Sequence, residues 1–236
     1  MFNKSGRYYD LIYSGKNYAE EAGKIAAAIR AECPSARTIL DVGCGTGEHA
    51  KYLSGEFRVD GIDLEPQFVE IARRKVPQGD FRVGDMICFD LGKRYDAVLC
   101  LFSAIGYMHT PERLTAALTC FKNHLNPGGV VLIEPWLTPE VWRVGVPHML
   151  TVDRPDIKIC RMNVSALEGR VSKIRFHYLV ATRDGVDYFV EDHNLTMYTV
   201  EEMLDCFKRA GLGVRHDPQG IAGRGLYIAR QGATAQ

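Results

Sequence analysis

The stretch from Leu40 to Ala50, LDVGCGTGEHA, decides the fold of this chain. An apolar run, TILDV, contains Asp41 near its end, and glycines then follow at every second position, Gly43, Gly45 and Gly47. Glycine permits the backbone angles and the close approach to a ligand that a nucleotide-binding turn requires. We therefore predict a strand, a nucleotide-binding loop and a helix in this stretch.

The spacing of the glycines argues against a dinucleotide as the ligand. A dinucleotide-binding turn has the pattern GxGxxG, in which the third glycine lets the helix pack close to the strand. Counting from Gly43 and Gly45, that third position is occupied by Glu48, which has a long charged side chain. Asp41 also adds a negative charge where a pyrophosphate would need positive potential. The loop is thus expected to face a cationic ligand.

Alternating strand and helix patterns surround this loop. Apolar runs predict five strands, at residues 38–42, 57–64, 80–83, 95–102 and 130–135. Pro66 and Pro111 stand at the favoured first position of two helices, and NPGG at 126–129 is expected to end the second one. This order predicts a doubly wound α/β fold with a parallel sheet.

The pattern changes between residues 136 and 198, where no helical period is present. The runs KICRMNVSA, VSKIRFHYLVAT and VDYFVEDHNLTMY are separated by turn signals and predict two antiparallel hairpins. Thr199 and Glu202 then form a capping box at the start of a helix, and two more strands follow. We predict that residues 1–135 and 199–236 form an α/β core, and that 136–198 are an inserted antiparallel lid, substrate region or dimer region.

Charge and cysteine content narrow the function. The 236 residues include 29 Lys and Arg and 29 Asp and Glu, so no overall field attracts nucleic acid or an anionic membrane. The seven cysteines form no CxxC pair, and the N-terminus has no secretory signal pattern, as expected of a reducing cytoplasm. No apolar run is long enough to span a membrane. We expect a cytoplasmic protein without nucleic-acid or membrane partners, and its long antiparallel edge allows a homodimer.

Two further acids follow strands at the same edge of the predicted sheet. Asp63 ends the second strand, where a carboxylate can bind both hydroxyls of a ribose, and Asp85 follows the third, where it can accept a hydrogen bond from an adenine amino group. Together with LDVGCGTG, these residues resemble the class I S-adenosylmethionine-dependent methyltransferases. The resemblance implies a seven-stranded Rossmann-like sheet whose last strand is antiparallel.

The resemblance also implies a cofactor, S-adenosylmethionine, and its product, S-adenosylhomocysteine. Asp41 and the 43–47 loop are then expected to face the amino-acid part, Asp63 the ribose, and Asp85 with Met86 the adenine. Two tyrosines beside the N-terminal loop are expected to cover the cofactor. The full set of cofactor candidates is Tyr9, Tyr18, Asp41, Gly43, Cys44, Gly45, Asp63, Leu64, Asp85, Met86, Leu101 and Phe102.

Longer stretches are similar to a narrower family, the N-methyltransferases of nucleotide-linked (TDP) amino sugars in macrolide antibiotic biosynthesis, which make desosamine and mycaminose. The similar segments are YDLIYSGKNYAEEA, LDVGCGTGEH, GDM, FSAIGY, GGVVLIEPW, FHYLVA and GRGLY. The resemblance implies methyl transfer to the amino group of a TDP-linked amino sugar. The chain departs from the family pattern at Leu137, where a second Trp often follows EPW, and at its short N-terminal arm, which has only Met1 and Phe2.

Tyr107 is the candidate catalytic residue, because it follows the fourth strand at the edge where such sheets bind ligands. An amine must be neutral to attack a methyl group, and a tyrosine with a pKa near 10 is a poor base at neutral pH. We therefore expect Tyr107 to position the substrate through its hydroxyl. Arg224, among glycines, is expected to bind a substrate phosphate. The other substrate candidates are Phe2, Glu134, Trp136 and His177.

Alternatives remain open at the level of sequence. One is an O- or N-methyltransferase of another small metabolite, and another is a non-catalytic S-adenosylmethionine-binding module whose inserted sheet makes a dimer interface. Arg224 favours an anionic substrate over the binding module. FSAIGY in place of an NPPY-like signature disfavours a planar base as the substrate. No metal site is expected, since neither His177 nor His193 stands at zinc-ligand spacing with a cysteine.

Overall fold

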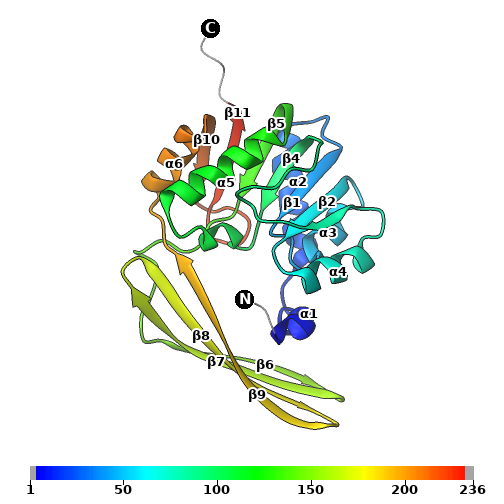
Figure 1. Ribbon diagram of the computed structural model, residues 1–236, viewed down its shortest axis with the longest axis vertical. Helices are drawn as coiled ribbons and strands as arrows, with labels where there is room; N and C mark the ends of the chain where they lie inside the picture. The colour runs from blue at the N-terminus through cyan, green and yellow to red at the C-terminus, as the bar shows by residue number, and fades with distance from the viewer. Residues whose placement is uncertain (1–3, 232–236) are drawn as a thin grey trace.

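The computed structural model describes residues 4–231, which form two separate β-sheets (Figure 1). The strands of the larger sheet are β1 (Thr38–Val42), β2 (Arg58–Asp63), β3 (Phe81–Val83), β4 (Tyr95–Cys100), β5 (Leu125–Ile133), β10 (Leu212–Asp217) and β11 (Leu226–Gln231). Their order is β10-β11-β5-β4-β1-β2-β3, and β11 runs antiparallel to both of its neighbours. The predicted seven-stranded sheet with an antiparallel last strand is confirmed.

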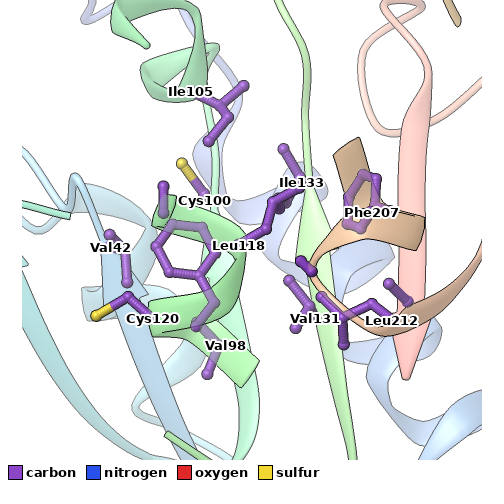
Figure 2. Packing of buried hydrophobic residues seen from close by; sticks show 14 of the residues in the cluster. Val42, Val98, Cys100, Ile105, Leu118, Cys120, Val131, Ile133, Phe207 and Leu212 are labelled. Atoms are coloured by element: carbon purple, nitrogen blue, oxygen red, sulfur yellow. The ribbon is translucent and has the colours of Figure 1, made fainter. Parts of the chain in front are cut away.

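Helices cover both faces of this sheet. One face carries α2 (Tyr18–Glu32), α3 (Glu48–Leu53) and α4 (Pro66–Lys75), and the other carries α5 (Pro111–Asn123) and α6 (Val200–Arg209). Successive residues of a strand point to opposite faces, so each strand feeds two apolar layers. Figure 2 shows Val98 and Cys100 of β4 in the layer that also holds Leu118 of α5 and Phe207 of α6.

The turn between α5 and β5 differs from the prediction. NPGG does not lie between the helix and the strand, because β5 begins at Leu125 and includes these residues. The pairing of β4 with β5 shifts from Tyr95–Leu125 to Ala97–Val130, so the extra residues form an irregularity within the strand. Gly128, with φ of 78°, accommodates this irregularity, which an apolar pattern alone does not reveal.

The insertion forms a four-stranded antiparallel sheet of β6 (Pro147–Arg154), β7 (Ile157–Glu168), β8 (Val171–Thr182) and β9 (Gly185–Thr196). The three long strands were predicted, whereas β6 was missed because most of its side chains are exposed and give little apolar alternation. In Figure 1 this sheet extends from the α/β core as a layer of its own. Its inner face carries the buried side chains Ile159, Tyr178, Val180 and Phe189, which pack against the N-terminal segment.

The N-terminal segment joins the two sheets. It contains the short helices η1 (Ser5–Tyr8) and α1 (Tyr9–Ile12), whose side chains Tyr8 and Ile12 pack against the inner face of the inserted sheet. The buried Glu191 of β9 accepts hydrogen bonds from the backbone N–H groups of Lys4 (2.9 Å) and Ser5 (3.0 Å) and from the Ser5 hydroxyl.

On the core side of this segment, Asp10 accepts a hydrogen bond from the Thr46 hydroxyl at 2.6 Å and pairs with Lys75 at 2.7 Å. Thr46 belongs to the glycine loop, and Lys75 ends α4. The same short segment is therefore fixed to the inserted sheet at one end and to the glycine loop at the other. The candidate site lies where these three parts meet.

Candidate active site

The glycine loop is shaped by three left-handed residues, Gly43 (φ 72°), Gly45 (φ 54°) and Gly47 (φ 77°). A Cβ atom on Gly43 would lie 2.8 Å from the Cβ of Ala104, and one on Gly47 would lie 3.0 Å from the Cβ of Ala72 in α4. A Cβ on Gly45 would meet no described atom within 4 Å. Gly47 thus allows the close helix packing that the third glycine of GxGxxG, which would stand at position 48, allows in a dinucleotide fold. At Gly45 the loop is open.

Two buried acids lie at the carboxyl ends of β1 and β2. Asp41 is only 2% exposed, and burial raises the pKa of its carboxyl to about 6, against a smaller opposing effect of His49. Asp63 accepts hydrogen bonds from the N–H groups of Gly45 (2.8 Å) and Glu65 (2.9 Å), and burial also raises its pKa. A carboxylate that burial makes costly to ionise is stabilised by a cation.

These features fit S-adenosylmethionine. The molecule carries a sulfonium and an ammonium, which suit buried acids, and two ribose hydroxyls, which suit a carboxylate at the end of the second strand. The open face of the loop at Gly45 provides backbone next to the acids without a side chain in the way. The groups around the loop therefore suit a cationic nucleoside better than a pyrophosphate.

The other cofactor candidates lie around this loop with different exposure. Cys44 and Leu101 are buried, and Leu64 is 62% exposed. The half-buried candidates are Tyr9, Tyr18, Asp85, Met86 and Phe102. Tyr9 packs against the rings of Tyr13 (4.7 Å between centroids) and Phe68 (5.0 Å), and Asp85 lies 3.8 Å from the guanidinium of Arg113.

The turn after β4 holds the strained backbone of the site. Phe102 (φ 49°) and Ser103 (φ 66°) are the only residues other than glycine with positive φ in the described part of the chain, and this conformation costs roughly 1–2 kcal/mol per residue. Glu134, at the end of β5 and 1% exposed, accepts a hydrogen bond of 2.7 Å from the N–H of Phe102. Ser103 donates to the carbonyl of Pro135 at 2.8 Å. Glu134 thus stabilises the turn that leads to Tyr107.

Arg224 and Trp136 approach this turn from the core. Arg224 donates a hydrogen bond of 3.1 Å to the Ser103 hydroxyl, and its guanidinium carbon lies 5.3 Å from the ring centre of Phe102 and 5.8 Å from that of Trp136. Trp136 donates from its indole N–H to the Ser172 hydroxyl of β8 at 2.9 Å. Trp136 therefore connects the loop of Arg224 to the inserted sheet.

A second arginine, Arg161 of β7, approaches from the inserted sheet. It donates a hydrogen bond of 3.0 Å to the Tyr13 hydroxyl, and its guanidinium lies 4.3 Å from the ring centre of Phe176. The ring of Tyr13 in turn meets the edge of Phe102, with 5.2 Å between centroids. Arg161 and Arg224 are both half-buried, and neither forms an ion pair with a carboxylate of residues 4–231.

Tyr107 is the last residue of η2 (Ala104–Tyr107), and its hydroxyl lies 2.8 Å from Nδ1 of His193 in β9. His193 is 3% exposed. Burial lowers the pKa of His193 to about 4, and burial also raises the pKa of Tyr107 well above its ordinary value. Both side chains are therefore neutral at physiological pH.

The structure does not bring His177 to this cluster. In the β8–β9 pairing His193 is opposite Ile174, whereas His177 is opposite Val190. Residues 174 and 177 are an odd number of positions apart, so His177 lies on the outer face, where its Nδ1 is 2.7 Å from the Tyr188 hydroxyl. The structure therefore does not bring His177 together with the other substrate candidates, and Phe2, another of them, lies outside the described residues.

Sequence reasoning missed several residues that the structure adds to the site, namely Tyr13, Ser103, Arg161, Phe176 and His193. His193 was considered only as a metal ligand. The signal that could have found it is the two-residue period of β9, since His193 shares its parity with the buried residues Phe189, Glu191 and Leu195. Arg161 and Tyr13 give no such signal, because their contact depends on the packing of α1 against β7.

Three further observations concern residues 4–231. No group of three or more His, Cys, Asp or Glu side chains converges there in a way that could hold a metal ion. None of the helices in this part of the chain has the length and apolar character that crossing a membrane requires. All seven cysteines are free thiols.

Comparisons with known proteins agree with this geometry. A family model described as a methyltransferase domain matches residues 39–129. The chain is 40% identical to the dTDP-3-amino-3,6-dideoxy-alpha-D-glucopyranose N,N-dimethyltransferase of Streptomyces fradiae, over 97% of this chain and 91% of that protein. It is 35% identical to the dTDP-4-amino-2,3,4,6-tetradeoxy-D-glucose N,N-dimethyltransferase of Saccharopolyspora spinosa, over 93% and 90%.

A solved structure gives the same assignment. An amino pentose methyltransferase from Micromonospora echinaspora, solved with bound S-adenosylmethionine, superposes with a TM-score of 0.86 at 35% identity, and 98% of each chain is covered. Identity at this level over the full length is evidence of common family as well as common fold. The chain therefore belongs to the S-adenosylmethionine-dependent N-methyltransferases that include these amino-sugar enzymes, and it is a methyltransferase whose cofactor is S-adenosylmethionine.

Proposed function

We propose that this enzyme transfers a methyl group from S-adenosylmethionine to the amino group of a TDP-linked amino sugar. The observation that carries the proposal is the pair of half-buried guanidiniums, Arg161 and Arg224, which have no carboxylate partner in residues 4–231. Two such guanidiniums on either side of Tyr13 and Phe102 suit the two phosphates of a nucleoside diphosphate. The named substrates of the two relatives are both TDP-linked amino sugars.

In this proposal, the positions of Asp41 and Asp63 determine which residues contact each part of the cofactor. Asp41 and the Gly43–Gly47 loop face the amino-acid part, with Cys44 beneath them, and Asp63 and Leu64 lie at the ribose. Asp85 and Met86 contact the adenine. The cofactor is covered by side chains from the N-terminal segment and the turn after β4, namely Tyr9, Tyr18, Leu101 and Phe102.

S-adenosylmethionine supplies an activated methyl group on a sulfonium, so the protein has little chemistry to add. The neutral amine nitrogen supplies the electron pair of the new N–C bond, the C–S bond breaks, and the nitrogen then loses its surplus proton to water. The residues contribute by holding the amine in line with the methyl group, an effect worth up to about 7–11 kcal/mol in favourable intramolecular cases. In this proposal Tyr107 holds the amine, and Trp136 and Glu134 shape the wall beside it.

We further propose that the inserted region, residues 136–198, closes the substrate side of a single core formed by 1–135 and 199–236. Two inner-face residues support this role: Arg161 contacts Tyr13 and His193 contacts Tyr107. The ring of Phe176 packs against both of them. Within this assignment the inserted sheet binds the nucleotide sugar and the core sheet binds the cofactor.

The outer face of the inserted sheet supports a homodimer. It carries exposed apolar side chains in adjacent rows of the sheet, among them Met149, Met162, Leu179, Tyr188 and Val190. The charges beside them are already paired within the sheet, Arg175 with Asp192 and Lys158 with Asp153. A face without unpaired charges can pack against the same face of a second copy, as a two-fold interface requires.

Leu179→Lys should convert the dimer to a monomer in light scattering, and a monomeric wild type would contradict this proposal.

We also propose that the enzyme works in the cytoplasm. Seven free thiols suit a reducing compartment, and Cys88 is exposed among them. S-adenosylmethionine and nucleotide sugars are cytoplasmic metabolites. Fractionation of the producing cells with an antibody against the chain would test this assignment.

The direct test is a methylation assay with defined acceptors. TDP-3-amino-3,6-dideoxyglucose and its 4-amino isomer are incubated with enzyme and S-adenosylmethionine, and mass spectrometry counts the methyl groups gained. We expect one of the isomers to gain one or two methyls. Turnover of unrelated amines or hydroxyl compounds in place of both sugars would favour a different small-molecule substrate, and no turnover with any acceptor would favour a binding module.

The role of the arginines has its own test. Arg161→Ala and Arg224→Ala should each raise KM for the TDP-sugar about 10- to 100-fold, as expected when a charge-assisted hydrogen bond is lost. The dissociation constant of S-adenosylmethionine, measured by calorimetry, should stay unchanged. Arg183→Ala, in the exposed β8–β9 turn, is the matched control and should leave KM unaltered. An unchanged KM in both site variants would remove these arginines from the site.

A further inference from the structure

We propose that His193 is a positioning residue that holds the Tyr107 hydroxyl so that its oxygen accepts an N–H of the substrate amine. The inference rests on the proposed function for the identity of the amine. Its structural basis is the 2.8 Å contact between the Tyr107 hydroxyl and Nδ1 of His193. His193 is buried in the middle of a regular antiparallel pairing, next to the ring of Phe176 at 5.3 Å, so its imidazole offers a fixed partner.

The direction of this hydrogen bond follows from the two groups. The unprotonated nitrogen of a neutral imidazole has a localised lone pair and accepts strongly, whereas the oxygen of a phenol shares its lone pair with the ring and accepts weakly. Tyr107 is therefore the donor and Nδ1 the acceptor, which places the remaining proton of His193 on Nε2. The lone pairs of the Tyr107 oxygen then remain for the substrate.

The surroundings of Tyr107 place its hydroxyl on the substrate side of the cofactor acids. After burial, the groups that raise its pKa are Tyr13, Asp63, Tyr178 and Glu191. Asp63 belongs to the cofactor side, whereas Tyr178 and Glu191 belong to the inner face of the inserted sheet. The phenol thus has Asp63 on one side and the inserted sheet, through His193, on the other, and in this proposal the amine meets the methyl group there.

The pair holds the amine but does not deprotonate it. Glu191 and Asp192 favour a charged His193, and Arg161 opposes it, but burial dominates and keeps the pKa near 4. An alkyl ammonium with a pKa of about 10 would transfer its proton to such an imidazole with an equilibrium constant of roughly one in a million. The proton of the amine therefore goes to water before the amine is bound, and the pH dependence of the rate follows the substrate.

This arrangement also limits the number of methyl groups. A neutral primary or secondary amine has at least one N–H to give to the Tyr107 oxygen while its lone pair faces the methyl group. A neutral tertiary amine has none, so nothing holds its lone pair in line. The same acceptor therefore serves a first and a second methylation and fails at a third.

The first test needs neither substrate nor cofactor. In protein labelled with ¹⁵N-histidine, the wild type should show His193 as the Nε2–H tautomer with a hydrogen-bonded, unprotonated Nδ1. Tyr107→Phe should shift the Nδ1 signal toward that of a free imidazole nitrogen. An Nδ1–H tautomer, or an Nδ1 signal that is insensitive to Tyr107→Phe, would overturn the proposed direction of the bond.

The second test separates positioning from a structural role. His193→Ala should lower kcat about tenfold or more, with KM for the TDP-sugar and affinity for S-adenosylmethionine nearly unchanged. His193→Asn, whose side-chain oxygen can take the place of Nδ1, should restore most of kcat. The double variant His193→Ala with Tyr107→Phe should be no slower than the worse single variant, because both remove one interaction.

The outcomes distinguish this inference from the proposed function. If the TDP-sugar is methylated by the wild type and His193→Asn is as slow as His193→Ala, His193 is only a packing residue. If kcat of the wild type and of His193→Ala are equal, the positioning role is excluded. If no TDP-sugar is methylated but the tautomer is as expected, the substrate assignment fails and the Tyr107–His193 geometry stands.

Discussion

The proposed cofactor side and the proposed substrate side of this site differ in charge and in how they are built. The cofactor side consists of Asp41, Asp63 and a glycine loop within 23 residues of sequence, and its charged groups are acids. The substrate side is assembled from Tyr13, Tyr107 and Arg224 of the core segments and from Arg161 and His193 of the inserted sheet. The charged side chains among these are arginines, and the two acids beside them, Glu134 and Glu191, already accept hydrogen bonds from backbone N–H groups. A cation is thus favoured at one end and an anion at the other, with a neutral Tyr–His pair between them.

The difference shows which unpaired charges destabilise the ligand-free protein. Within residues 4–231, it buries a carboxylate without a cation on the cofactor side and leaves two guanidiniums without acids on the substrate side. Each arrangement is costly in the ligand-free protein and is relieved by a ligand of the opposite charge. The contrast can be tested by variants that affect one side and leave the other unchanged.

Asp41→Asn should have the largest effect. It removes the buried charge that faces the cofactor, so affinity for S-adenosylmethionine should fall 100-fold or more in calorimetry. Burial raises the pKa of Asp41 from 3.8 to about 6, so above pH 6 its ionised form costs the folded state about 3 kcal/mol. The ligand-free variant should therefore melt several degrees higher at pH 8 than the wild type.

Asp96→Asn is the matched control for this variant. Asp96 lies at the opposite edge of the sheet, where it accepts hydrogen bonds from the N–H groups of Arg37 (2.8 Å) and Thr38 (3.0 Å). This variant should melt lower and bind S-adenosylmethionine normally. A lower melting temperature in Asp41→Asn as well would show that Asp41 stabilises the fold and would contradict the contrast.

The same pKa predicts how cofactor affinity depends on pH. A cation binds the ionised form of Asp41, so below pH 6 part of the binding free energy is used to remove a proton. Affinity for S-adenosylmethionine should weaken by up to about tenfold per pH unit as pH falls below 6. Asp41→Asn should show no such dependence, and a flat profile in the wild type would mean that Asp41 does not face the cation.

Two glycine variants should separate the two sides further. Gly43→Ala would place its Cβ 2.8 Å from Ala104, in the helix that ends at Tyr107, so kcat and melting temperature should both fall. Gly45→Ala adds only backbone strain of roughly 1–2 kcal/mol in the protein itself, but its methyl group points into the open side of the loop and should weaken cofactor binding. Equal effects of the two variants on kcat and on cofactor affinity would argue against this separation.

Glu191→Gln should have a smaller effect that reaches both sides. The amide can still accept from one N–H group, but its bonds to Lys4 and Ser5 are weaker than those of a carboxylate. Hydrogen exchange of residues 5–13 should become faster, and KM for the TDP-sugar should rise a few-fold. Glu168→Gln, in the exposed end of β7, is the control and should change neither.

His177→Asn should have the smallest effect. Because His177 lies on the outer face of the inserted sheet, kcat and KM should stay within about twofold of the wild type. A loss of activity comparable to that of His193→Ala would place the substrate on the outer face instead.

The strand, loop and helix of the proposed cofactor side could be predicted from the sequence because their signals are local. A strand, an acid and alternating glycines determine the loop within a few residues, and Asp63 and Tyr107 follow directly from strand ends at one edge of a parallel sheet. The capping box at Thr199 was equally local and is confirmed. A sequence motif of a few residues is sufficient to predict such local features.

The substrate side could not be predicted in the same way, because it depends on register and packing. A shift of β9 by one residue relative to β8 would exchange its two faces, and the turn at residues 183–184 together with the alternation of buried residues in β9 fixes that register. The choice between His177 and His193 rests on it. The contact of Tyr13 with Arg161 joins residues 148 positions apart, and no local pattern encodes it.

The bond network of Glu191 has a consequence for the order in which this chain can fold. Lys4 and Ser5 are synthesised first, yet their partner lies 187 and 186 residues later in β9. The N-terminal segment must therefore wait, while the first five strands of the core can already pair with near neighbours. Closure of the site therefore has to follow formation of these first strands, so a bulky fusion at the N-terminus should hinder maturation of activity more than it hinders formation of the core.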